Sequence, residues 1–266
     1  MLQIYWHQFI ISTLTFLYFC IMLTFFKPKP ILKDIIIDNF IDIHSHLLPG
    51  IDDGAQNIED TNFLISEMNK MGFKQCITTP HVMENVWKNS RKKIELNLDT
   101  TQIELRNKNN NVPIKAAAEY MMDANFVTLF QNEPLLTLKK NYVLVEISYI
   151  NPPIQLYDII FDLQVAGYKP ILAHPERYSF FHHNFNDYQK LKYSGCLFQI
   201  NLLSIIGYYG IEVAKTAEQL LKKGMIDFVG SDIHHSNHIN GFSKKILLKD
   251  LSPVKDAIEN NSFFSF

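Results

Sequence analysis

From residue 40 onward, short β-rich apolar runs alternate with longer segments in which apolar residues recur at helical spacing. The seven runs are residues 40–44, 75–81, 114–119, 142–148, 169–174, 197–201 and 226–232. Their continuous Ile, Val, Leu and Ala content is typical of strands buried on both faces, as in parallel sheets. Strands that alternate with helices predict right-handed crossovers and a parallel α/β fold.

The segments between the runs carry helix signals. Asn57 can cap a helix that ends before Gly72, and Pro152 and Pro153 are placed to open a later one that ends before Gly167. Gly195 and Gly224 stand where two further helices should finish. A further helix is predicted because three apolar residues would lie on one of its sides, namely Ile94, Leu98 and Leu105.

Polar residues with metal-binding or catalytic chemistry follow almost every predicted strand. Together with one residue of an Asp-Asp-Gly turn they form a set of nine: His44, His46, Asp53, His81, Glu119, Glu146, His174, Asp232 and His234. In a closed barrel the carboxyl ends of parallel strands meet at one rim, where the active sites of such barrels lie. An open sheet would spread these ends too widely for one site. The sequence therefore predicts a distorted seven-stranded (β/α) barrel.

Taken singly, each of these groups has an ordinary explanation, such as a turn for Asp-Asp-Gly or a helix cap for Asp-x-His. Their recurrence at successive strand ends is what predicts a metal site. Imidazoles and carboxylates without thiolates suit Mn²⁺, Fe²⁺ or Zn²⁺ and argue against a structural zinc site. Nine ligands exceed what one ion needs, so two or three ions are expected. With four carboxylates, a third divalent ion would leave a cationic site for a phosphomonoester dianion.

The net charge and the cysteines exclude several classes of protein. The 266-residue chain has a formal net charge of −2, so it carries no basic surface of the kind that nucleic acid requires. Three scattered cysteines do not form a disulfide framework and suit a reducing compartment. None of the three precedes an arginine by six positions, since Phe26, Val82 and Leu202 stand there. This spacing excludes the phosphate loop of cysteine-dependent tyrosine phosphatases.

Residues 1–37 differ from the rest and are expected to form an apolar N-terminal segment and linker before a domain at 38–266. Residues 1–26 contain no Asp, Glu, Lys or Arg, and residues 9–26 are long enough to span a bilayer as a helix. Lys27, Lys29 and Lys33 follow this stretch and no cation precedes it, which argues against a cleaved signal peptide. The stretch is either a membrane anchor or an artefact of the assigned start, with translation really beginning at Met22. We favour the second explanation. In both cases the domain is expected in the cytoplasm, and an anchor would attach it to the cytoplasmic face of the membrane.

Seven motifs in order carry a resemblance to a known family. They are D-I-H-S-H, L-P-G-I-D-D-G-A, T-P-H, A-E-Y, E-I-S, A-H-P-E-R and G-S-D-I-H, spread over about residues 38–235. The chain resembles the polymerase and histidinol phosphatase (PHP) superfamily. More closely, it resembles the bacterial branch of manganese-dependent protein tyrosine phosphatases from capsule and exopolysaccharide loci. The resemblance implies a PHP-type barrel that hydrolyses phosphotyrosine on the tail of a bacterial tyrosine autokinase.

The resemblance also implies roles for individual residues. Three ions would be held by His44, His46, Glu119 and Asp232; by Glu119, His81 and His174; and by Asp53, Glu146 and His234. Arg177 would grip the phosphate through its fork of donors, and a metal-bridging hydroxide would attack phosphorus. Asp42 and Glu176 are expected to fix imidazole tautomers, and Asp52 to shape its turn.

The chain departs from the family that it resembles after the last motif. Relatives often carry an arginine there, whereas this chain has His235, Ser236, Asn237 and His238. Arg177 would then bind phosphate alone or with Lys88 and Arg91. Trp87, on the same predicted loop, would either stack on a tyrosyl substrate at the rim or pack against a neighbouring loop.

Two alternatives to a tyrosine phosphatase remain at this point. One is a phosphatase for a small phosphoester such as histidinol phosphate, which would have the same fold. The other is a membrane-anchored binding protein whose metal cluster is purely structural. The nine-residue set argues against the second alternative, because structural metal sites are closed and rarely polynuclear.

Overall fold

A computed structural model describes residues 29–182 and 184–266 of the chain. Within it, Ile31–Phe266 form one compact unit. Most of the predicted N-terminal segment, including the apolar residues 9–26, lies outside the described residues. None of the described helices combines the length and the apolar composition that crossing a bilayer requires.

Each predicted run contributes strand structure. The strands are β1 (Phe40–Asp42), β2 (Phe73–Thr78), β3 (His81–Val82), β4 (Ile114–Ala116), β5 (Glu119–Met121), β6 (Tyr142–Glu146), β7 (Lys169–Ala173), β8 (Leu197–Asn201) and β9 (Phe228–Gly230). All neighbouring strands pair in parallel, as predicted. The runs at 75–81 and 114–119 are each divided into two short strands.

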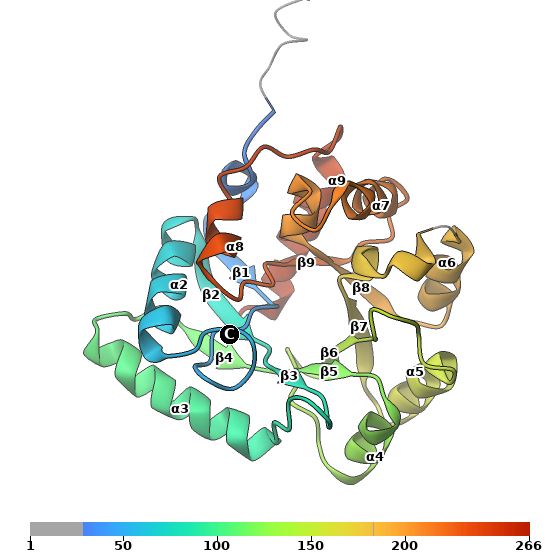
Figure 1. Cartoon of the computed structure of the whole chain (residues 1–266), viewed down its shortest axis with the longest axis horizontal. Helices are drawn as coiled ribbons and strands as arrows, with labels where there is room; N and C mark the ends of the chain where they lie inside the picture. The colour runs from blue at the N-terminus through green and yellow to red at the C-terminus, as the bar shows by residue number, and fades with distance from the viewer. Residues whose placement is uncertain (1–28, 183) are drawn as a thin grey trace, which may run out of the picture. The chain divides into compact units, whose positions relative to one another are not determined.

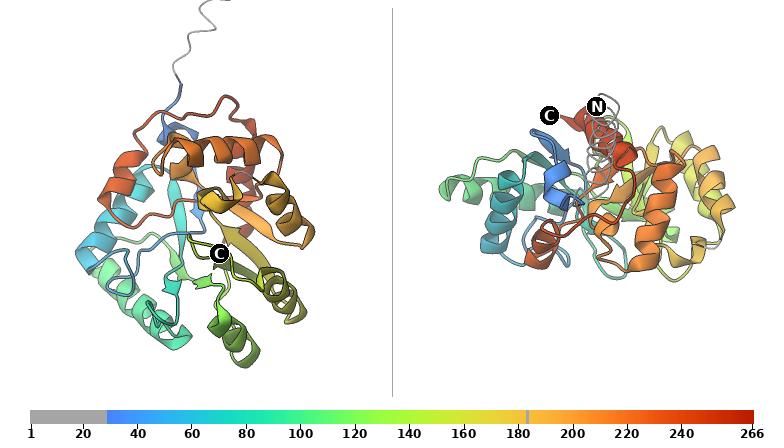
Figure 2. Two further views of the ribbon diagram at one scale, coloured as in Figure 1. Left: turned by 45° about the vertical axis from the view of Figure 1, so that its right-hand side comes forward. Right: turned by 90° about the horizontal axis from the view of Figure 1, so that it is seen from above.

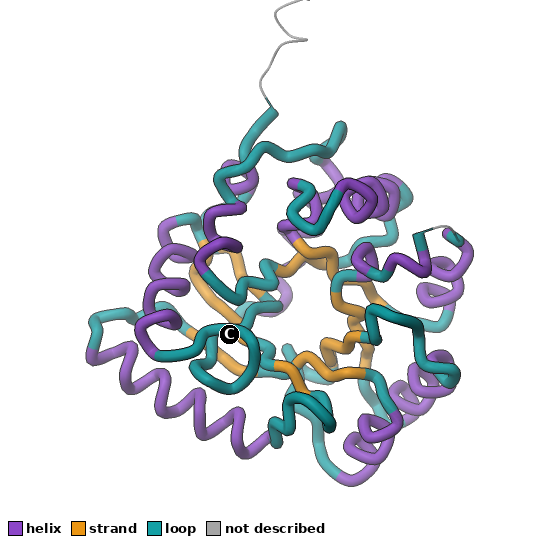
Figure 3. The backbone as a smooth tube through the Cα atoms, in the orientation of Figure 1, coloured by secondary structure: helices purple, strands orange, loops and turns teal. Residues whose placement is uncertain are grey.

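The closed seven-stranded barrel is not confirmed. In the described residues the strands form two parallel sheets, in the orders β1-β2-β4 and β3-β5-β6-β7-β8-β9. Pro80 lies at the break between β2 and β3 and has no N–H to continue the ladder. Single hydrogen bonds still link the sheets, with Asp232 N donating to His44 O at 2.7 Å and His46 N to Ile233 O at 2.9 Å. The strands therefore surround a common centre without forming one continuous sheet (Figure 3).

Helices lie outside the strands (Figures 1 and 2). They are α2 (Ile58–Lys70), α3 (Arg91–Asn107), α4 (Ala124–Asn132), α5 (Leu156–Val165), α6 (Phe185–Tyr193), α7 (Ile211–Lys222), α8 (Ser236–Gly241) and α9 (Ser252–Asn260), with short 3-10 helices η1 (Leu32–Ile35), η2 (Pro175–Arg177), η3 (Ser179–Phe181), η4 (Leu202–Ile206) and η5 (Asn261–Phe264). Asn57 caps α2 as expected, its side chain accepting from Asp60 N at 2.9 Å. The helix predicted after Pro152 and Pro153 begins only at Leu156, because the two prolines occupy the preceding loop.

Alternating side chains of the strands supply two layers of core. Along β6, Val143 and Val145 pack outward with α5 residues such as Ile160, whereas Leu144 belongs to a central cluster that also contains Ile171. All five side chains are fully buried. Burial on both faces explains the continuous apolar runs in the sequence. It leaves most of the polar chemistry to residues at or beyond the strand ends, with Gln199 inside β8 as an exception.

Candidate metal centre

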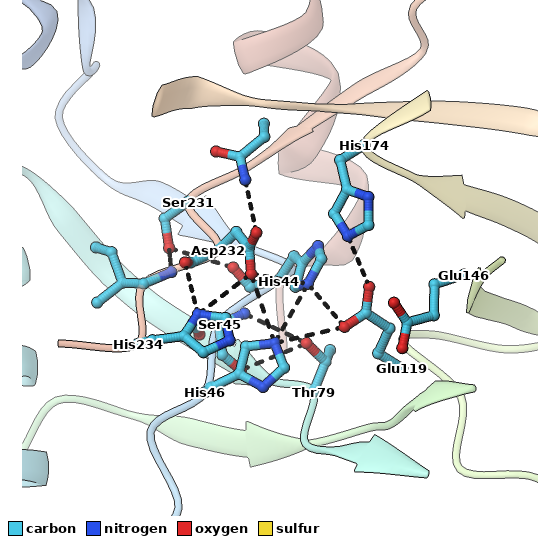
Figure 4. Close-up of polar contacts among 12 residues, drawn as sticks. His44, Ser45, His46, Thr79, Glu119, Glu146, His174, Ser231, Asp232 and His234 are labelled. Atoms are coloured by element: carbon cyan, nitrogen blue, oxygen red, sulfur yellow. Dashed lines mark hydrogen bonds and ion pairs between the residues drawn. The ribbon is translucent and has the colours of Figure 1, made fainter. Parts of the chain in front are cut away.

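The polar residues that follow or end the strands converge on one place (Figure 4). His44 and His46 come directly after β1, Glu119 opens β5 and Glu146 ends β6. His174 follows β7. Asp232 and His234 follow β9, and Asp53 and His81 complete the set. All nine predicted residues belong to overlapping groups. Within each group, the ligand atoms lie within 4.8 Å of one another.

Four side chains from three segments face a common point. His44 Nε2 lies 3.3 Å from Glu119 Oε2 and 3.4 Å from Asp232 Oδ1. His46 Nε2 lies 3.5 Å and 3.6 Å from the same two oxygens, and 3.4 Å from His44 Nε2. Ligand atoms at about 2.0–2.2 Å from one ion in a tetrahedral arrangement are about 3.3–3.6 Å apart. The spacing of the two histidine nitrogens from each other and from the two carboxylate oxygens therefore matches one coordination sphere.

A second group surrounds Asp53. Its Oδ1 lies 3.4 Å from His81 Nε2 and 3.5 Å from His234 Nε2. The division of ligands that the resemblance implied placed Glu146, rather than His81, with Asp53 and His234. The two nitrogens of His81 explain the difference, because Nε2 faces Asp53 while Nδ1 lies 3.0 Å from Glu146 Oε1.

A third group is centred on Glu119, which lies between the others. Its Oε1 is 3.0 Å from His174 Nε2, and its Oε2 is 3.1 Å from His81 Nδ1. Glu146 joins this group through the same nitrogen of His81. Because its two oxygens face different partners, Glu119 can bridge two ions.

The chemistry of these groups fits divalent cations. Glu119 Oε2, Glu146 Oε1 and His81 Nδ1 are buried and make no hydrogen bond of standard geometry among the described residues, although His81 Nδ1 lies within ion-pair distance of both oxygens. Leaving buried polar atoms unsatisfied costs about 1–3 kcal/mol each, and more for charged groups. Oxygen and imidazole ligands without thiolates suit Mn²⁺, Fe²⁺ or Zn²⁺. A bound cation would satisfy all three atoms.

Two imidazoles are oriented by buried partners that the sequence did not reveal. The Nδ1 of His44 is 2.7 Å from Gln199 Oε1, and the Nδ1 of His46 is 2.7 Å from Asp52 Oδ2. In both rings this contact leaves Nε2 free to face the centre. The sequence signal for Gln199 was a polar residue inside the apolar run 197–201. Asp52 had been expected only to shape its turn, and it also does so by accepting from Gly54 N at 2.9 Å.

The residues predicted to fix imidazole tautomers have other partners. Asp42 accepts hydrogen bonds from the backbone N and the hydroxyl of Ser231, at 2.9 and 2.7 Å. Glu176 Oε1 accepts from Asn201 N at 3.0 Å and from Ser204 Oγ at 2.6 Å. Asp42 therefore ties β1 to the segment after β9, and Glu176 ties η2 to the end of β8 and to η4.

The backbone around the centre is unusually constrained. His174 and Asp232 have φ values of +35° and +51°, in the left-handed region that residues with side chains rarely adopt. A Cβ on Gly54 would lie 2.2 Å from His46 O, and one on Gly230 would lie 2.6 Å from His44 Cβ. Such local strain persists only where the surrounding structure enforces it, typically at functional sites.

The carboxylates favour the protonated forms of His46 and His81, whereas burial lowers the pKa of His174 to about 4. Burial lowers the pKa of His46, but the facing Asp52 outweighs this effect and the pKa rises to about 10. Burial also lowers the pKa of His81, whereas Glu119 and Glu146 raise it to about 12. An ion that binds these nitrogens must therefore displace protons.

Arg177 lies beside the centre, as the resemblance implied. It lines a cavity of about 250 Å³ together with Asp53, His81, His174, Asp232 and His234, and with Tyr149, Tyr209, His235 and His238. The Nη1 of Arg177 donates to Asp232 Oδ2 at 2.8 Å. The cavity thus combines a cation with the candidate metal ligands.

The predicted substrate rim lies elsewhere. Trp87, Lys88 and Arg91 line a different cavity, of about 620 Å³, and none of them lines the cavity of Arg177. Lys88 pairs with Glu84 at 3.3 Å, and Arg91 with Glu95 at 2.9 Å. The groups that join Arg177 are instead tyrosines and histidines.

The chain is similar to known proteins over most of its length. Residues 40–241 match the family model for capsular polysaccharide synthesis, CpsB/CapC. The chain is 28% identical to the tyrosine-protein phosphatase YwqE of Bacillus subtilis over 78% of this chain and 82% of YwqE. It is 25% identical to the tyrosine-protein phosphatase CpsB of Streptococcus pneumoniae over 73% of this chain and 83% of CpsB.

Solved structures give the same relationship. One structure from a study of YwqE and CpsB, described as unique metal-dependent tyrosine phosphatases, matches with a TM-score of 0.71 and 26% identity over 85% of this chain and 88% of that one. An amidohydrolase from Mycoplasma synoviae shares the fold, with a TM-score of 0.51 and 12% identity over 87% of this chain and 88% of that one. The family predicted from the motifs is confirmed, and the relatives agree with the predicted enzyme class. The chain belongs to the CpsB/CapC family of capsular polysaccharide synthesis.

Proposed function

We propose that this protein is a metal-dependent protein-tyrosine phosphatase that removes phosphate from phosphotyrosine on a protein. The observation that carries the proposal is the common point faced by His44, His46, Glu119 and Asp232, beside Arg177. The names of the relatives support the substrate class.

The nine converging residues are the proposed metal ligands. One ion would be held by His44, His46, Glu119 and Asp232; a second by Asp53, His81 and His234; and a third by Glu119, Glu146 and His174. The preferred ion is Mn²⁺, with Fe²⁺ or Zn²⁺ as alternatives. Bound ions would supply Lewis-acid stabilisation of the phosphoryl charge and activate water near neutral pH.

The protein's own groups would bind and orient the phosphate. The side-chain hydrogen bond of Arg177 within the described residues goes to Asp232, which leaves its Nε and Nη2 donors for phosphoryl oxygens. A guanidinium can contact two such oxygens at once. Gln199 and Asp52 hold His44 and His46 with Nε2 turned to the centre.

The proposed physiological substrate is the phosphorylated tail of a bacterial tyrosine kinase that controls capsule or exopolysaccharide synthesis. The family's place in capsular polysaccharide synthesis supports this partner. We place the enzyme in the cytoplasm, where it would reach such a tail. An anchor formed by residues 9–26 would attach it to the cytoplasmic face of the membrane.

The test compares hydrolysis of a phosphotyrosine peptide and of histidinol phosphate by the full chain with Mn²⁺. We expect the peptide to be the better substrate, and we expect a chelator or His44→Ala to abolish its hydrolysis. Lys74→Ala, on the exposed surface of β2, is the matched control and should keep full activity. Activity that survives both the chelator and His44→Ala would contradict the metal mechanism. Preference for histidinol phosphate would make the protein a small-ester phosphatase.

A further inference from the structure

The guanidinium of Arg177 lies against two tyrosine rings. Its Cζ is 4.0 Å from the ring centroid of Tyr209 and 4.9 Å from that of Tyr149. Both distances are inside the range of about 6 Å over which a cation is attracted to an aromatic face. Arg177 ends η2, while Tyr149 follows β6 and Tyr209 follows η4. Three separate segments therefore form this arrangement, which we call the arginine clamp.

Tyr209 is tied into a closed set of contacts with Arg177. Its hydroxyl accepts from Asn201 Nδ2 at 3.2 Å, and the same nitrogen donates to Asp232 Oδ2 at 2.7 Å. Asp232 Oδ2 also accepts from Arg177 Nη1 at 2.8 Å. The four side chains thus form a ring of contacts, so a shift of Tyr209 is opposed from two directions.

Tyr149 connects the clamp to the metal centre. Its ring stacks on the imidazole of His174, with centroids 5.7 Å apart and planes at 21°. Its hydroxyl is 3.4 Å from Nε2 and 3.5 Å from Nδ1 of that imidazole. The nearly parallel ring planes, together with the similar distances to both nitrogens, place the hydroxyl against the face of the imidazole. Tyr149 therefore covers a candidate ligand and Arg177 together.

We propose that Tyr149 and Tyr209 are positioning residues that hold the Arg177 guanidinium in the orientation that receives a phosphoryl group. An arginine side chain has many rotamers, and binding that must first order it is weakened by the lost entropy. The ion pair with Asp232 fixes one guanidinium nitrogen of Arg177, and the two tyrosine rings restrict the orientation of the guanidinium plane. The inference rests on the proposed function, which supplies phosphate as the ligand.

The experiment measures binding of inorganic phosphate to the Mn²⁺-loaded protein by calorimetry, together with kcat and KM for p-nitrophenyl phosphate. Tyr149→Leu and Tyr209→Leu remove the rings and should each weaken phosphate binding about 3- to 30-fold. Tyr149→Phe and Tyr209→Phe keep the rings, so each should lose less phosphate affinity than the leucine variant at the same position. Tyr193→Leu, at a tyrosine that is 88% exposed on α6, is the matched control. Bound metal is measured in every variant.

A double-mutant cycle tests whether the tyrosines act through Arg177. In an Arg177→Ala background, Tyr209→Leu should cause no further loss of phosphate affinity, because its target is gone. An equal loss in both backgrounds, leucine variants that bind phosphate normally, or a wild type that binds no phosphate would each overturn the proposal.

The same measurements separate this inference from the proposed function. Wild-type protein that binds phosphate through the clamp but hydrolyses no phosphotyrosine would contradict the function and leave the clamp in place. Normal hydrolysis with unchanged phosphate affinity in the leucine variants would contradict the clamp alone.

Discussion

The Nδ1 of His46 and the Oδ2 of Asp52 lie 2.7 Å apart, fully buried, six residues from each other in the chain. The same Oδ2 accepts from the backbone N of His81 at 3.1 Å, and the other oxygen accepts from Gly54 N. One carboxylate thus orients one candidate metal ligand and fixes the backbone of another. The corresponding partner of His44 is the neutral amide of Gln199.

We predict that Asp52→Asn lowers Mn²⁺ affinity about 10- to 100-fold although Asp52 is no ligand, because partners that orient ligating histidines typically have effects of this size. Metal titration and kcat/KM for p-nitrophenyl phosphate are the measurements. Asp38→Asn, on the exposed surface, is the control. Unchanged affinity in Asp52→Asn would show that the imidazole of His46 needs no such support.

Metal binding should strengthen as pH rises. In the ion-free protein the pKa values of His46 and His81 are raised to about 10 and about 12, so both rings hold protons at neutral pH. An ion must displace these protons, and each one displaced makes the affinity rise about tenfold per pH unit. Calorimetry with Mn²⁺ between pH 6 and 8, in buffers of different ionisation heat, measures both quantities. A flat affinity with no proton release would contradict the prediction.

Gly54→Ala should damage both folding and metal binding. Its Cβ would lie 2.2 Å from His46 O and 2.4 Å from His46 Cβ, so the turn that carries Asp53 must move. We expect a loss of about 2–4 kcal/mol in the free energy of unfolding, typical of severe steric conflict in a packed site. Urea unfolding and metal titration test this.

Gly167→Ala is the comparison for that variant. A Cβ there meets nothing within 4 Å, and only its φ of +91° is unfavourable. The loss should be about 1–2 kcal/mol, with metal affinity unchanged. Equal behaviour of the two variants would show that contact with His46 is not the cause.

Glu176 should make the free energy of unfolding decrease as pH rises through the mildly acidic range. Burial raises its pKa to about 7, against the opposing hydrogen bond from Ser204, and its Oε2 has no hydrogen-bond partner in the described chain. The folded protein therefore keeps a proton that the unfolded chain releases above its ordinary pKa of 4.5. The stabilisation is complete below that pKa and is lost as pH rises to about 7, by roughly 3 kcal/mol.

Glu176→Gln removes this titration. The stability of Glu176→Gln relative to wild type should increase by roughly 3 kcal/mol between pH 4 and pH 8. Urea unfolding of both proteins with a chelator measures the difference, and the titrations of the metal ligands cancel between them. Parallel pH profiles would contradict the assignment.

The strands are evident in the sequence because strands buried on both faces leave a continuous apolar signal. Helix α4 was not predicted, although Asp123 caps it by accepting from Phe126 N at 2.9 Å. A closed barrel was predicted, whereas the hydrogen-bonded ladder breaks near Pro80 and leaves two sheets in the described chain. Ladder continuity depends on exact backbone placement, which apolar periodicity does not encode.

The sequence by itself determined the set of nine candidate ligands, because imidazoles and carboxylates at the ends of parallel strands must meet at one edge. Only the tertiary structure decided how they group, for example that His81 faces Asp53 with one nitrogen and Glu146 with the other. It also decided that Asp52 and Gln199 orient the histidines, and that tyrosines rather than Trp87 surround Arg177. These choices depend on side-chain direction between segments far apart in the chain, and no local pattern of residues carries that information.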